Sequence, residues 1–110
     1  MVDSFYGMHW MLATPFHQNE EVDYDSIPNL VQQAISSECT GVVGLGVMGE
    51  AARLTDRERT KIAETIIKSS GNLPVTLGTT ANGTKAMIER SKEAEQIGAA
   101  AVMVSAPSMP

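Results

Sequence analysis

Closely spaced glycines follow an apolar run near the middle of the chain, in the segment Gly41-Val42-Val43-Gly44-Leu45-Gly46-Val47-Met48-Gly49-Glu50. Glycine lets the backbone turn sharply or approach a ligand closely at little steric cost. Backbone N–H groups gathered in such a loop attract anions, including the carboxylate of a keto acid. We therefore predict a substrate-binding loop at residues 46–50, the glycine loop. Its members are Gly46, Val47, Met48, Gly49 and Glu50.

Two further side chains, Thr14 and Thr79, are candidates for this site. Thr14 follows the apolar run at residues 8–13, and Thr79 follows the run at residues 74–78. Barrel enzymes place pocket residues at the carboxyl ends of their strands, although Thr14 could instead form a turn with the proline that follows it. Glu50 has two candidate roles, either as an acid or base in the pocket or as an acceptor for backbone donors that hold the loop.

Four short apolar runs predict strands. They cover residues 8–13, 41–46, 74–78 and 101–104. The second run is apolar on consecutive residues, as expected for a parallel strand that is covered on both faces.

Helical periodicity predicts a helix in each interval between these strands. The first has one apolar stripe, Ile27, Leu30, Val31, Ala34 and Ile35, after a cap at Asp25 or Ser26. The second begins with a capping box, Thr55 and Glu58, and ends at Gly71-Asn72. The third is predicted to start with Thr84 as its cap and to end at Gly98.

Alternating strands and helices predict an α/β fold, a parallel βα repeat with right-handed crossovers. Both a doubly wound open sheet and a (β/α)8 barrel fit this alternation. A full barrel needs about 250 residues, whereas this chain has 110. On the barrel interpretation, residues 1–110 are a single partial domain, the N-terminal half of a TIM barrel with four strands and three helices.

The glycines also match a dinucleotide-binding pattern. Gly44-Leu45-Gly46-Val47-Met48-Gly49 fits G-x-G-x-x-G after a strand and resembles the corresponding loop of β-hydroxyacid dehydrogenases. That pattern needs a helix beginning at its third glycine and an acidic residue after the next strand. Here the helix signal begins at Thr55, and the next strand ends in Gly78-Thr79-Thr80. An NAD-binding domain is therefore an alternative that fits less of the chain.

A set of short motifs, in order along the chain, fits more of it. The set is Gly7, Leu12–Phe16, Gly46–Glu50, Leu54, Glu58-Arg59, Pro74-Val75, Gly78, Glu95, Gly98-Ala99 and Ala106-Pro107. It resembles the dihydrodipicolinate synthase and N-acetylneuraminate lyase family over almost the whole chain. The resemblance implies a (β/α)8 barrel, usually tetrameric, in which a lysine forms a Schiff base with pyruvate or another 2-keto acid. It implies no cofactor.

The glycine loop departs from the family pattern Gly-(Thr/Ser)-Thr-Gly-Glu at two positions, where Val47 and Met48 replace hydroxyl residues. In the family these hydroxyls and the loop N–H groups hold the substrate carboxylate, and the first hydroxyl belongs to a proton relay. Backbone donors at Val47 and Met48 would keep the carboxylate contact, but the hydroxyl relay is lost. This favours a divergent member that acts on sugar-derived 2-keto-3-deoxy acids.

The resemblance places the Schiff-base lysine on the sixth strand and its tyrosine on the fifth, both beyond Pro110. We therefore predict no catalytic residue within the chain. Its lysines, Lys61, Lys68, Lys85 and Lys92, fall on predicted helices and are expected to be solvated. Three arginines near the capping box, Arg53, Arg57 and Arg59, are expected to pair with acids on the surface.

Composition limits the partners. A net charge of −5 argues against a nucleic acid or an anionic membrane. The apolar runs are too short to span a bilayer, and no secretory signal is evident, so we expect a cytoplasmic protein. One cysteine and two scattered histidines predict no metal site. A half barrel leaves sheet edges open and should form homo-oligomers. A non-catalytic half barrel, a fragment or assembly module, is the remaining alternative to the lyase.

Overall fold

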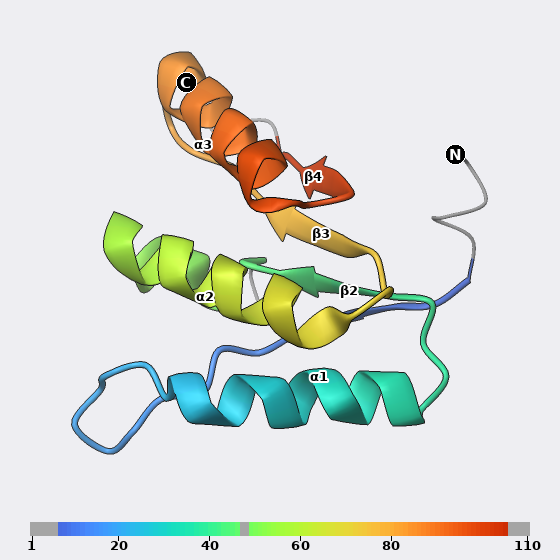
Figure 1. Cartoon of the computed structure of the whole chain (residues 1–110). Coiled ribbons are helices and arrows are strands. Elements are labelled where there is room, and N and C mark those ends of the chain that lie inside the picture. Colours follow the sequence, from blue (N-terminus) through green and yellow to red (C-terminus); the bar gives the residue numbers. More distant parts are fainter. Residues whose placement is uncertain (1–6, 47–48, 106–110) are drawn as a thin grey trace.

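Four parallel strands form one sheet in chain order, β1-β2-β3-β4 (Figure 1). The computed structural model describes residues 7–46 and 49–105. The strands are β1 (His9–Met11), β2 (Gly41–Gly44), β3 (Val75–Gly78) and β4 (Ala101–Met103). Each lies within a run that the sequence marked as a strand, and every pairing is parallel. The predicted parallel βα repeat is confirmed.

Three helices connect successive strands, α1 (Ile27–Ser36), α2 (Asp56–Ser70) and α3 (Thr84–Ile97). Two short 3-10 helices precede the first two, η2 (Tyr24–Ser26) and η3 (Ala51–Arg53). In Figure 1, α2 lies alongside β2 and β3, with α1 on one side of it and α3 on the other. Parallel strands need such crossovers, since a short turn cannot return the chain to the start of the next strand.

The core lies between these helices and one face of the sheet. Val42, Leu77, Val31 and Ile62 are at most 2% exposed. The predicted stripe of α1 is buried at Ile27, Val31 and Ala34, whereas Ile35 at its end is 39% exposed. Strand residues alternate between faces, so the register aligns a second set on the other face of the sheet. This set is Met11, Val43, Thr76 and Ala101.

The ends of the helices follow the predictions in part. The capping box of α2 is present, with Thr55 accepting from the Glu58 amide at 3.1 Å and Glu58 accepting from the Thr55 amide at 2.9 Å. The predicted cap of α3 was wrong by one residue. Gly83 is the N-cap, in an extended conformation, and Thr84 is the first helical residue.

Ser26 occupies the N-cap position of α1, but its side chain makes no capping hydrogen bond. Asp23 instead caps η2, because its carboxylate accepts from both the amide and the hydroxyl of Ser26. The hydroxyl bond measures 2.6 Å and lowers the pKa of Asp23. The residue that precedes α1, Ser26, is therefore held in place by Asp23 in the preceding turn.

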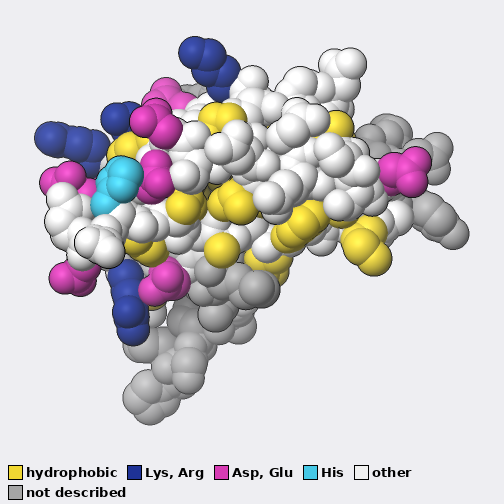
Figure 2. Space-filling view, turned by 90° about the horizontal axis from the view of Figure 1, so that it is seen from below, with side chains coloured by type: hydrophobic (Ala, Val, Ile, Leu, Met, Phe, Trp, Pro, Cys, Tyr) yellow, Lys and Arg dark blue, Asp and Glu magenta, His cyan; other side chains and the backbone are white. Residues whose placement is uncertain are grey.

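Charged side chains are mixed in sign over the surface seen in Figure 2. Lys and Arg side chains lie among Asp and Glu, mostly toward one end of this face, and hydrophobic side chains run across its middle. Within residues 7–46 and 49–105, no helix is long and apolar enough to cross a membrane.

Candidate substrate-binding site

The glycine loop follows β2 at the carboxyl edge of the sheet. Its described residues are Gly46, Gly49 and Glu50; the predicted members Val47 and Met48 lie outside the described residues. The Gly46 carbonyl accepts from the amides of Gly49 at 3.1 Å and Ala51 at 3.4 Å. These two hydrogen bonds bring residues 49–51 back beside Gly46, close to the end of β2. Gly46 and Gly49 are both buried.

Thr14 holds the loop from the β1 side. Its hydroxyl donates a 2.6 Å hydrogen bond to the Gly49 carbonyl, and the residue is 8% exposed. A Cβ at Gly49 would lie 3.2 Å from the Thr14 hydroxyl and 3.3 Å from the Leu12 carbonyl, so a larger residue would press on the end of β1. The structure therefore brings Thr14 and Gly49 together, and Thr14 contacts the loop itself.

Gly46 lies between two methionine side chains. A Cβ built at Gly46 would be 3.2 Å from Met11 Sδ and 3.3 Å from Met103 Cε. Met11 belongs to β1 and Met103 to β4, so Gly46 is bordered by apolar side chains from both outer strands of the described sheet. Such surroundings strengthen electrostatic contacts with backbone N–H groups, because they exclude water.

Glu50 points elsewhere. It is exposed, has a left-handed backbone with φ 55°, and lies 3.5 Å from Arg53 as an ion pair. Its carboxylate makes no capping hydrogen bond to η3. We predicted that this carboxylate could accept hydrogen bonds from backbone N–H groups. The nearest such groups, those of η3, do not donate to it.

Thr79 is directed toward α3. It is 2% exposed, and its hydroxyl lies 3.0 Å from the Ser91 hydroxyl. Its amide donates to the Met103 carbonyl at 3.0 Å, which continues the pairing of β3 with β4. The side chain of Thr79 is therefore not brought together with Thr14 and Gly49, although all three residues lie at the same edge of the sheet.

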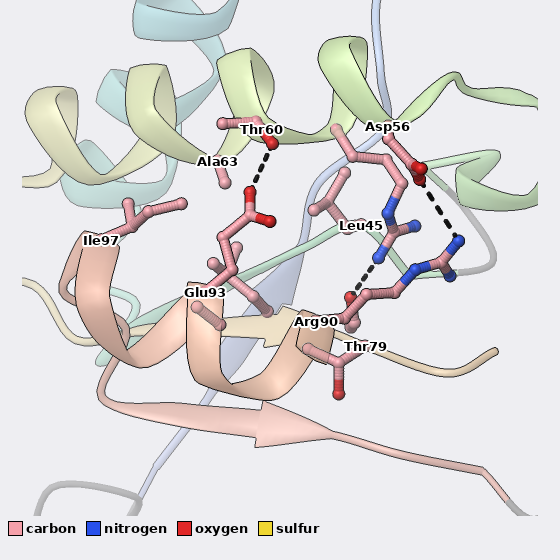
Figure 3. A pocket seen from close by; sticks show the side chains of 12 residues that line it. Leu45, Asp56, Thr60, Ala63, Thr79, Arg90, Glu93 and Ile97 are labelled. Atoms are coloured by element: carbon pink, nitrogen blue, oxygen red, sulfur yellow. Dashed lines mark hydrogen bonds and ion pairs between the residues drawn. The ribbon is translucent and has the colours of Figure 1, made fainter. Parts of the chain in front are cut away.

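A small cavity of about 30 Å³ lies between α2 and α3. Figure 3 shows the polar side chains around it, with Asp56 paired to Arg90 and Thr60 bonded to Glu93. Arg59 also lines this cavity.

The prediction that Arg59 pairs with acids on the surface was wrong. Arg59 is 7% exposed and donates a 2.9 Å hydrogen bond to the Gly78 carbonyl. Burial lowers the pKa of its guanidinium, and the charge of Arg90 lowers that pKa further. The sequence did contain a signal, since Arg59 shares the helical spacing of Ile62, Ala63 and Ile66, which form the buried face of α2.

Comparison with known proteins decides between the two architectures that fit the alternation. The sequence pattern of the Dihydrodipicolinate synthetase family matches residues 4–108. The chain belongs to this family. A relative named 4-hydroxy-tetrahydrodipicolinate synthase, from Oceanobacillus iheyensis, is 39% identical over 97 residues, which are 87% of this chain and 33% of that protein.

Solved structures of the dihydrodipicolinate synthetase family have the same fold. The enzyme from Rhodopseudomonas palustris superposes with a TM-score of 0.91 at 33% identity, over 96% of this chain and 36% of that one. The dihydrodipicolinate synthase from Acinetobacter baumannii, solved in complex with pyruvate, gives 0.90 at 32% identity, over 94% and 36%. The fold is thus that of the N-terminal part of a (β/α)8 barrel, and the chain spans about a third of the length of these relatives.

Membership of the dihydrodipicolinate synthetase family leaves the dehydrogenase alternative without support. The local geometry agrees, because η3 separates the glycine loop from α2, which begins at Asp56. In a dinucleotide site the helix N-terminus faces the pyrophosphate directly after the glycines.

The four lysines of the chain are on the surface of the helices. Lys61, Lys68, Lys85 and Lys92 are all exposed, on α2 and α3. A lysine that forms a Schiff base is usually desolvated, because burial lowers the pKa of its ammonium group and supplies the neutral amine. None of the four has that environment.

Proposed function

We propose that this chain supplies the carboxylate-binding part of a lyase that acts on pyruvate or a related 2-keto acid. The observation that carries the proposal is the glycine loop at the carboxyl edge of the sheet, closed on itself at Gly46 and held by Thr14. Enzymes with barrel folds bind their substrates at this edge. A carboxylate would accept hydrogen bonds from backbone N–H groups of residues 46–50, including those of Val47 and Met48.

The reaction itself would proceed through a Schiff base whose lysine is not among residues 1–110. The exposure of all four lysines supports this part of the proposal. The solved structure of the dihydrodipicolinate synthase from Acinetobacter baumannii in complex with pyruvate favours pyruvate as the substrate. A sugar-derived 2-keto-3-deoxy acid has the same carboxylate and keto group, and the replacement of hydroxyl residues by Val47 and Met48 favours this second substrate class. We also propose that the protein is cytoplasmic, because its apolar runs are too short to span a bilayer and no secretory signal is evident. We propose a homo-oligomer because the outer strand β4 exposes apolar side chains.

Titration of the ¹⁵N-labelled chain with pyruvate tests the proposal. We expect saturable changes in the amide resonances of Gly46 and Gly49, and none with methyl pyruvate, which has no carboxylate charge. Borohydride treatment in the presence of pyruvate should leave the mass of the chain unchanged. A trapped adduct on the 11.8 kDa polypeptide would contradict the placement of the lysine elsewhere.

A non-catalytic assembly module is the second candidate. Val102 within β4 is 41% exposed, Val104 just beyond its end is 50% exposed, and Ile88 on α3 is 48% exposed. This apolar surface could be covered by another protein chain, or by further elements of a complete barrel. The same titration separates the two candidates, because a purely structural glycine loop would show no response to pyruvate.

A further inference from the structure

Arg59 is a buried cation that donates a hydrogen bond close to the glycine loop. The residue is 7% exposed, and its Nη2 donates to the Gly78 carbonyl at 2.9 Å. Burial of a guanidinium is unfavourable unless its donors are satisfied. A surface helix such as α2 could place an apolar residue at this position at lower cost, so the arginine requires another explanation.

Gly78 is where the end of β3 touches the glycine loop. A Cβ at Gly78 would overlap the Leu45 carbonyl oxygen and lie 3.5 Å from the Gly46 nitrogen. Gly78 is not among the glycines with positive φ. Glycine is therefore needed here for space rather than for its backbone conformation, because the two backbones lie directly against each other.

Leu45 has an unusual conformation at this contact. Its φ is 59°, in the left-handed region that non-glycine residues rarely adopt, and it is 7% exposed. Such a conformation persists only where the surrounding structure imposes it. The Gly78 backbone is part of that surrounding structure, since it lies directly beside the Leu45 carbonyl.

We propose that Arg59 is a positioning residue for the glycine loop. By holding the Gly78 carbonyl, it fixes the end of β3 against Leu45 and Gly46, and so sets the direction in which the loop leaves β2. The expected effect on ligand binding rests on the proposed function. Arg59 would affect binding because it fixes the position of the backbone N–H groups that would meet a keto-acid carboxylate. The claim that Arg59 positions the loop does not depend on any ligand.

Arg59→Met tests the proposal, because methionine keeps much of the length and removes the donor. Arg57→Met is the matched control, the same substitution on an exposed residue of the same helix. We expect Arg59→Met to move the amide resonances of Leu45, Gly46 and Gly78, and to weaken pyruvate binding on the order of tenfold, the effect of one lost hydrogen bond. Arg57→Met should do neither. Arg59→Lys, which retains a charged donor, should recover part of the affinity.

Unchanged Leu45 and Gly46 resonances in Arg59→Met would overturn the proposal. An affinity loss that Arg59→Lys does not recover at all would also count against it, since a general packing defect would explain that result. If the resonances move while the unsubstituted chain shows no response to pyruvate, the positioning of the loop stands and the proposed ligand fails. Should Arg59→Met not fold, Arg59→Leu, which also lacks a donor, takes its place, and Leu45 and Gly46 resonances that coincide with those of the unsubstituted chain would refute the proposal.

Discussion

Thr14 joins the end of β1 to the glycine loop through one short hydrogen bond. The bond to the Gly49 carbonyl is buried, and its partners are 35 positions apart in the sequence. Water cannot readily replace a partner lost at such a site, so a buried carbonyl left without its donor is costly.

Thr14→Val should therefore destabilise the chain by about 1–3 kcal/mol, because valine has a similar shape but cannot donate to the Gly49 carbonyl. Thr14→Ser is the control, since it retains the hydroxyl and loses only a methyl group. Urea unfolding followed by circular dichroism measures both. Equal midpoints for Thr14→Val and the unsubstituted chain would show that the hydrogen bond contributes nothing to stability.

At the scale of single residues, the glycine spacing indicated where the chain turns tightly after β2, and the substrate-binding role of the loop stays a prediction. The residues that hold this turn were harder to predict. Glycine spacing marks Gly46 and Gly49 because close approach excludes a side chain there, and Thr14 was marked by its place after a strand. Arg59 was missed because its type suggests a surface residue, whereas its helical spacing places it on the buried face of α2. The orientation of Thr79 toward Ser91 depends on packing against α3, which local sequence does not encode.

Among the elements, the turn before α1 contains a carboxylate that stabilises a helix start. Asp23 accepts from the amide and hydroxyl of Ser26, and the hydroxyl bond is the main cause of its lowered pKa, with a smaller contribution from the charge of His17. A carboxylate whose folded pKa is lowered stabilises the fold above its unfolded pKa, which is 3.8 for Asp23. That contribution is lost as the pH falls below 3.8 toward the lower folded value.

Asp23→Asn should therefore be less stable than the unsubstituted chain at neutral pH, and the difference should shrink as the pH falls below 3.8. The measurement is a series of urea unfolding curves at decreasing pH for both proteins. Asp25→Asn, an exposed neighbour in the same turn, is the control and should show no such convergence. A difference that stays constant with pH would mean that the charge of Asp23 does not stabilise this turn.

Element type was well predicted from the sequence because the apolar periods of strands and helices differ so clearly. Element ends were less certain. Thr84 was favoured as a cap because a hydroxyl can accept from the first amides of a helix. Gly83 takes that position instead, since its extended backbone already turns the chain into α3. Capping is unambiguous only where two side chains act together, as Thr55 and Glu58 do.

For the whole molecule, the alternation of strands and helices could not by itself distinguish an open sheet from a barrel. Both contain the same local units, and they differ in how the outer strands are paired. The family match and the solved structures made that distinction. What the structure adds is an apolar outer strand, β4, in which Val102 is 41% exposed. Among the described strands, β4 is paired only with β3.

This outer strand predicts that the chain associates with itself in solution. Exposed apolar side chains on a strand with an open edge favour pairing with a second sheet, and charges placed there oppose it. Sedimentation should give a mass above 11.8 kDa for the unsubstituted chain. Val102→Lys combined with Val104→Lys should shift the chain toward monomer, whereas Ile35→Lys, on the 39% exposed end of α1, should not. A monomeric unsubstituted chain, or equal effects of the two sets of substitutions, would show that β4 is not the surface of association.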